Sequence, residues 1–96
     1  MNRHDRALRR LVHEFLDEGR RFEDFHEGFI AQWTRLPARA LAPAARSRWN
    51  DIYGLVLIAL PDPVGAEDTA RGAIGEAELR RRLRRHPLLA GASEPG

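Results

Sequence analysis

The chain has 96 residues, 43% hydrophobic and 31% charged, a composition that suits one small globular domain and is too short for two. A domain of this size builds one small core, which excludes doubly wound sheets and barrels. The formal net charge is only +2 and every basic residue is arginine, so composition alone gives little indication of nucleic-acid binding. The absence of cysteine excludes disulfides, thiolate metal sites and cysteine nucleophiles.

Two features of the sequence bear on its location. The longest apolar run, residues 55–60, is far shorter than the roughly 20 residues needed to cross a bilayer. The arginine-rich residues 1–10 are not followed by the apolar core of a signal peptide. We therefore expect a cytoplasmic protein that makes no contact with a membrane.

Two amphipathic helices are predicted in the first part of the chain. Residues 3–18 repeat apolar side chains at helical spacing, and Gly19 is expected to end this helix as a left-handed cap. A second helix over residues 22–36 carries an aromatic and apolar stripe and ends before Pro37, its members being Phe22, Phe25, Phe29, Trp33 and Leu36. The link of about two to four residues between them indicates an antiparallel hairpin.

A third helix is predicted after an alanine- and proline-rich linker, residues 37–43. Pro43 suits the first turn of this helix, which we expect to run to Leu60. Its last two turns are apolar nearly all round, so a buried β-strand over residues 53–60 is the competing interpretation. The helix is preferred because the 3.6-residue pattern continues unbroken through the segment.

The C-terminal part is predicted to hold an acidic loop and a fourth helix. The loop covers residues 62–73, and Gly75 is an acceptable N-cap for the helix that follows. Ile74 and Leu79 occupy the two positions of a hydrophobic staple, and Pro87 is expected to end the helix.

The expected fold is therefore all-α, a small antiparallel four-helix bundle. It forms a single helical domain over residues 1–96, with an ordered core over about residues 5–89. The C-terminal tail is expected to be frayed.

No residue pattern predicts catalysis, a cofactor or a metal. None of the hydroxyl groups has a recognisable activating neighbour in the sequence. One Glu-x-x-His pair, Glu23 and His26, has the spacing of di-iron bundles, but such a site needs a second copy and two further inward glutamates. We therefore expect a protein that is not an enzyme.

Charge is distributed in blocks whose sign alternates along the chain, and two blocks hold candidate binding residues. An acidic set is the candidate partner-binding surface, because a concentrated potential steers a charged partner: Asp62, Glu67, Asp68, Glu76 and Glu78. A basic set on the fourth helix could bind phosphates: Arg80, Arg81, Arg84 and Arg85. For both, a solvated or internally paired surface is the competing interpretation. Nucleic-acid binding is less favoured because charge is nearly balanced and no base-stacking aromatic lies nearby.

Apolar side chains surround the end of the third predicted helix, where Leu55, Leu57 and Ile58 occur together. Either the other helices cover this segment, or it meets a second copy of the chain in a homodimer. The sequence leaves both interpretations open.

With the helices placed, the chain resembles the colicin D type of immunity protein, within the bacterial self-protective colicin-like immunity family. The resemblance covers residues 8–89. It rests on the sequence Leu-Val-His-Glu-Phe-Leu at 11–16, the Asp-Glu-Gly turn at 17–19, Phe25 and Phe29, Pro61-Asp62, and residues 74–79.

The resemblance implies a small four-helix antiparallel bundle that binds a cognate tRNA-cleaving toxin domain and blocks its basic active-site cleft. In such proteins acidic residues near the end of the third helix and in the next loop stand in for RNA phosphates, and Asp62 matches such a position. This sequence departs from the pattern at Leu57, where an acid is expected. The leading hypothesis is therefore a non-enzymatic toxin inhibitor that uses the acidic surface. The alternative is a nucleic-acid-associated or dimeric helical module that uses Arg80–Arg85.

Overall fold

The N-terminal half of the chain forms two helices that pack against each other. In the computed structural model, which describes residues 2–90, these are α1 (Arg3–Asp17) and α2 (Phe22–Thr34). Gly19 has a φ of +74°, so it forms the predicted left-handed cap, and residues 18–21 are the only link between the two helices. Asn2 begins α1 by accepting hydrogen bonds from the backbone N–H groups of His4 and Asp5.

The third helix, α3 (Pro43–Leu57), begins with the predicted proline but ends earlier than expected. Residues Ala59–Leu60 form strand β1, so the prediction of a helix to Leu60 is wrong for its last residues. Proline at position 61 disfavours helical geometry in the preceding residue, and the extended backbone finds partners in β2 (Ile74–Gly75). The two strands run parallel and pair Ala59 with Ile74 and Leu60 with Gly75.

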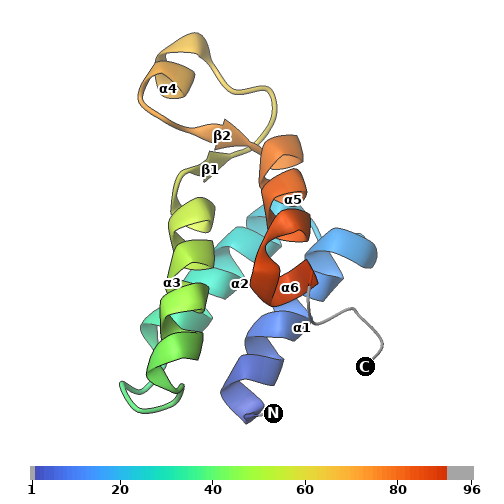
Figure 1. Ribbon diagram of the computed structural model, residues 1–96. Coiled ribbons are helices and arrows are strands. Elements are labelled where there is room, and N and C mark those ends of the chain that lie inside the picture. Colours follow the sequence, from blue (N-terminus) through green and yellow to red (C-terminus); the bar gives the residue numbers. More distant parts are fainter. Residues whose placement is uncertain (1, 91–96) are drawn as a thin grey trace.

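The prediction of a loop over residues 62–73 is wrong for its middle, where residues between the strands form a short helix, α4 (Ala66–Ala70). The predicted last helix is α5 (Glu76–Arg85), with Gly75 at its N-cap. Pro87 follows its end as expected and starts one further turn, α6 (Pro87–Ala90). Figure 1 shows α4 and its loop beyond the strands, away from the body of helices. Residues 91–96 of the tail predicted to fray lie outside the described part of the chain.

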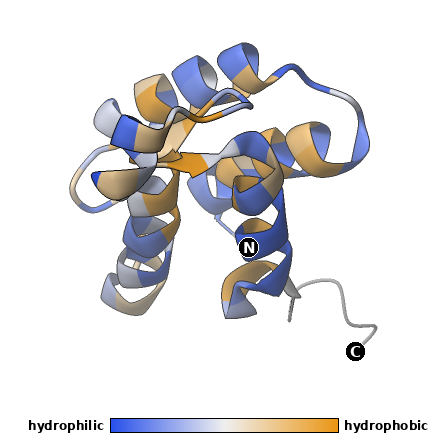
Figure 2. Cartoon of the chain, turned by 90° about the horizontal axis from the view of Figure 1, so that it is seen from above, coloured by the Kyte–Doolittle hydropathy of each residue, from blue (hydrophilic) through white to orange (hydrophobic). Residues whose placement is uncertain are grey.

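One apolar core joins the longer helices. It contains the predicted aromatic stripe of α2 together with residues from α1, α3 and α5, and its fully buried side chains include Phe15, Phe25, Phe29, Trp49 and Leu79. Phe15 stacks on Phe25 with ring centroids 4.3 Å apart, which fastens α1 to α2. Figure 2 shows hydrophobic and hydrophilic segments alternating along the helices, as expected for helices that bury one face.

The structure thus confirms a mostly helical, compact chain, 69% helical over the part described. Within residues 2–90, no helix combines the length and the apolar character that crossing a membrane requires.

Candidate functional site

The acidic loop, residues 62–73, holds two acids whose side chains make no internal polar contact in the described part of the chain. Glu67 and Asp68 lie in the first turn of α4, and both are exposed. Neither side chain makes an ion pair or a hydrogen bond within the part of the chain that the structure describes. α4 lies at the far end of the loop, away from the body of helices (Figure 1), so both acids belong to a segment that extends beyond the helices.

Asp62, in the same loop, has a structural contact. Its Oδ2 accepts a hydrogen bond from the backbone N–H of Ala77 at 3.0 Å, in the first turn of α5. The N-cap residue Gly75 has no side chain to make this bond, so Asp62 supplies the cap from across the loop. A carboxylate at this position also complements the positive end of the helix dipole.

The two remaining predicted acids, Glu76 and Glu78, are paired with arginines on their own helix. Glu76 Oε2 lies 2.8 Å from Arg80 Nη2, and Glu78 lies 2.7 Å from Arg81 Nη1 and 2.9 Å from Arg82 Nε. The hydrogen bond from Arg82, with the nearby charges of the arginines, holds the pKa of Glu78 below its ordinary value of 4.5, although desolvation acts in the opposite direction. The structure therefore does not bring the five predicted acids into one unpaired surface.

Two arginines of the predicted phosphate-binding set are engaged with the end of α1. Arg80 Nη1 donates to the carbonyl oxygen of Phe15, and its guanidinium lies 3.9 Å from the centre of the Phe15 ring. Arg84 Nη2 donates to the carbonyl oxygen of Leu16 at 2.7 Å and contacts Asp17 at 3.1 Å. These carbonyls belong to the last turn of α1 and have no partner within that helix, so the arginines stabilise a helix end.

The rest of the predicted basic set is exposed. Arg81 is paired with Glu78, whereas Arg85 has no hydrogen bond or ion pair among residues 2–90. The basic set thus divides between contacts to α1, a pair within α5 and one exposed arginine.

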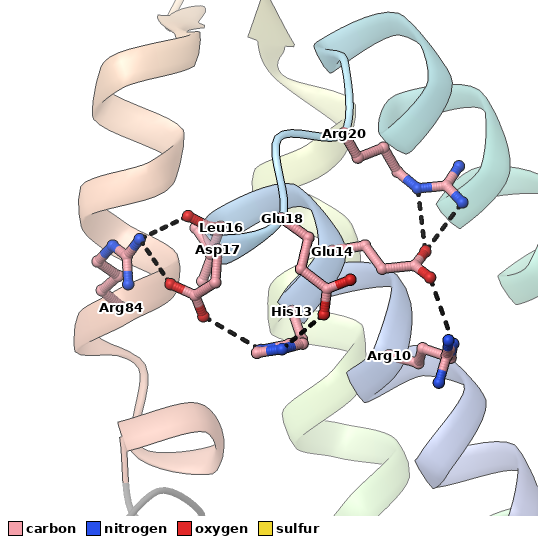
Figure 3. Close-up of polar contacts among 8 residues, drawn as sticks. All are labelled: Arg10, His13, Glu14, Leu16, Asp17, Glu18, Arg20 and Arg84. Carbon is pink, nitrogen blue, oxygen red and sulfur yellow. Dashed lines mark hydrogen bonds and ion pairs between the residues drawn. The ribbon is translucent and has the colours of Figure 1, made fainter.

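Figure 3 shows that the C-terminal turns of α1 form a balanced network of charges. Asp17 contacts both Arg84 and His13, and the other nitrogen of His13 lies 2.8 Å from Glu18. Glu14 contacts Arg10 at 3.3 Å and Arg20 at 2.9 Å. The acids of α1 therefore face cations of the same chain and are not available as an open acidic surface.

A buried polar network that was not predicted from the sequence joins α1, α3 and α6. Asp5, only 8% exposed, accepts a hydrogen bond from Trp49 Nε1 at 2.6 Å and another from Arg9 Nε at 2.8 Å. Arg9 also donates to the carbonyl oxygen of Leu88 at 3.0 Å. The spacing of Asp5 and Arg9 along one helix face was the one available signal, since Trp49 lies 44 residues away.

The Glu-x-x-His pair and the hydroxyl groups do not gather into a common site in the described part of the chain. Glu23 is exposed beside Arg21, whereas His26 packs against the Phe22 ring, and no group of three or more potential ligands that could hold a metal ion occurs among residues 2–90. The hydroxyl group of Thr34 donates to carbonyl oxygens of its own helix, α2, and that of Thr69 donates to the carbonyl oxygen of Gly65, the N-cap of α4.

The three apolar residues considered for self-association differ in their exposure to solvent. Leu57 is 51% exposed and Ile58 40% exposed, and these are the exposed large hydrophobic residues of the described chain. Leu55 is partly buried against the core. The apolar surround of α3 is therefore only partly covered by the chain itself.

Comparison of the chain with protein-family models, curated proteins and solved structures finds no match. The resemblance to the colicin-like immunity family accordingly stays a prediction.

Proposed function

We propose that this chain is a non-enzymatic, cytoplasmic protein that binds and inhibits another protein, most concretely the basic cleft of a tRNA-cleaving toxin domain. One observation carries the proposal: Glu67 and Asp68 are exposed and unpaired on a loop that extends beyond the helices. The other acids near that loop are occupied in capping or in ion pairs. In this proposal α1, α2, α3 and α5 are the four helices of the antiparallel bundle that the resemblance implies.

Charge complementarity explains how such a loop would act. Two unpaired carboxylates on a protruding segment present negative charge where RNA would present phosphates, and a basic cleft attracts both. Because Asp62 holds the loop to α5, the carboxylates reach a partner on a supported segment. This reduces the ordering that binding requires.

The test first asks whether a nuclease toxin domain is encoded beside the gene, and then measures binding of the full chain to that domain and protection of cells that express it. We expect the double variant E67Q/D68N to associate about tenfold more slowly or worse, with a weaker salt dependence. The matched control D24N/E27Q removes the same charge from exposed acids of α2 and should bind like the wild type.

Two results would contradict the proposal. Equal binding by E67Q/D68N and the wild type would show that the acidic loop is not the contact surface. Absence of both binding and protection by the wild type would reject toxin inhibition itself. The alternative module based on Arg80–Arg85 has less support, since Arg80 and Arg84 already hold the end of α1.

A further inference from the structure

The end of the molecule opposite the acidic loop gathers arginines from three segments. The start of α1, the link of residues 35–42 and the start of α3 all lie there (Figure 1). Asn2 joins two of these segments by donating from Nδ2 to the carbonyl oxygen of Ala40 at 2.5 Å. We call this region the basic end and define it by Arg3, Arg35, Arg39, Arg46 and Arg48.

Positive charge at the basic end is not balanced by the chain's own acids. Residues 31–50 contain four arginines and no aspartate or glutamate. The exposed side chains of the set make no hydrogen bond or ion pair within residues 2–90: Arg3, Arg35, Arg39 and Arg48. Asp5, the acid at the start of α1, is already bound to Arg9 and Trp49. This differs from α5, where Glu76 and Glu78 neutralise neighbouring arginines.

Arg46 adds an unsatisfied donor to the same region. Its guanidinium lies 5.3 Å from the centre of the Trp33 ring, and its Nη1 atom is buried without a hydrogen-bond acceptor. A buried donor without an acceptor costs free energy, so a ligand that supplies an acceptor beside this arginine would be stabilised. Arg46 lines an open depression of about 400 Å³ together with Ser47 and Asn50, whose hydroxyl and amide groups can donate to an anion.

The start of α3 strengthens the positive potential. Its N-cap residue, Ala42, provides no side-chain hydrogen bond, and its first turn contains no acid. The positive end of the helix dipole is therefore left without a compensating carboxylate, in contrast to α5.

We propose that the basic end binds the phosphate backbone of a nucleic acid. Arginine is suited to this because its planar guanidinium donates to phosphate oxygens in a bidentate manner. A protein partner would be expected to contact exposed apolar residues, which usually form the centre of such an interface. The exposed large hydrophobic residues of the described chain, Leu57 and Ile58, lie at the other end of α3. The basic end therefore offers charge without an apolar centre for a protein interface.

The test uses fluorescence anisotropy with a labelled DNA duplex of about 20 base pairs and a single-stranded RNA of about 20 nucleotides, two sources of the same phosphate chemistry. Two full-length variants each lose three arginine charges: R35Q/R39Q/R48Q at the basic end and R81Q/R82Q/R85Q on α5. We expect micromolar binding of at least one probe in low salt. The basic-end variant should lose at least about tenfold in affinity, whereas the α5 variant should change less than about threefold.

Salt dependence provides a second readout. Each lost phosphate contact should reduce the slope of log K against log salt by about 0.9 for the duplex and about 0.7 for a single strand, so the basic-end variant should lose about two to three units. Equal losses in the two triple variants, or no binding at micromolar protein, would overturn the proposal. Poly-glutamate binding as tightly as either probe would also overturn it, in favour of an acidic protein.

This inference is independent of toxin inhibition, and the two can fail separately. E67Q/D68N should bind nucleic acid like the wild type, because its substitutions lie at the opposite end. Thermal unfolding of the basic-end variant should match that of the wild type, since the replaced side chains make no internal polar contacts.

Discussion

Gly75 lies so close to the Asp62 carboxylate that a side chain at this position has no room. A Cβ atom would collide with Asp62 Oδ1 and would lie 3.2 Å from Val64 Cγ2. The backbone of Gly75, with φ of −83°, is open to any residue, so close approach and not backbone freedom explains the glycine. The same carboxylate caps α5, which makes the two residues a coupled pair.

We therefore predict that G75A destabilises the protein by about 1 kcal/mol, because the added methyl group displaces the capping carboxylate. D62A should cost a similar amount. In the D62A background the cost of G75A should largely disappear, because the carboxylate that the added methyl group displaces is no longer present. Alanine at position 75 also reduces the freedom of the unfolded chain, which offsets part of any remaining cost. Denaturant unfolding of the four proteins checks this double-mutant cycle, and additive effects would contradict the coupling.

The lowered pKa of Glu78 gives a second prediction at the residue scale. R82Q removes the hydrogen bond that is its main cause, so the pKa of Glu78 should rise toward 4.5 in an NMR titration. R84Q should leave it unchanged, because Arg84 contacts Asp17. A lowered folded-state pKa stabilises the fold above the unfolded value, about 4.5, and this contribution is lost as pH falls through the folded-state value. Any stability difference between R82Q and the wild type should therefore be largest at neutral pH and shrink in acid.

At the scale of elements, α2 contributes most of the aromatic core. Phe29 is fully buried and packs between Phe25 and Trp49, with ring centroids 5.7 and 6.2 Å away. We predict that F29A costs about 3–5 kcal/mol, a large share of the roughly 5–15 kcal/mol that holds such a domain together. The exposed control I58A should cost less than about 1 kcal/mol, and similar denaturation midpoints for F29A and the wild type would contradict the assigned core.

The helices were predictable because each carries its own local signals. The aromatic spacing of α2, Pro43 at the start of α3 and Gly75 before α5 all act within a few residues, and each prediction is confirmed. Strand β1 was covered only by the competing interpretation of a strand over residues 53–60, which is wrong for residues 53–57 because these belong to α3. Its true extent could not be predicted from local signals. Two residues are too few to show a period of two, and their extended backbone depends on partners at Ile74 and Gly75 that are distant in sequence.

The candidate site was predictable in residue type but not in the state of each residue. The spacing of four between Glu76 and Arg80, and between Glu78 and Arg82, could have indicated their ion pairs. The contacts of Arg80 and Arg84 with α1 depend on how α5 docks, which no local pattern encodes. The unpaired state of Glu67 and Asp68 likewise emerged only from the folded chain.

At the scale of the whole molecule, exposed apolar surface is concentrated at the end of α3. Because Leu57 is 51% exposed, L57E should remain folded, so its effect reports on contacts between chains. We predict that the wild type self-associates at high micromolar concentration and that L57E sediments as a folded monomer. The control S47E adds the same charge at an exposed position of α3 and should associate like the wild type. A wild type that is monomeric at the highest concentration would contradict this prediction.

The parallel pairing of β1 with β2 has a consequence for how recognition could diversify. The pairing holds the two ends of the acidic loop together, so the packing of the helices does not depend on the sequence of the loop. Lengthening a flexible loop costs little, about 0.6 kcal/mol for each doubling, once its ends are fixed. Apart from the Asp62 contact, residues 63–73 could therefore be exchanged for another sequence while the core stays intact. The molecule separates folding from partner choice, so a change of partner can arise by replacing one short insert.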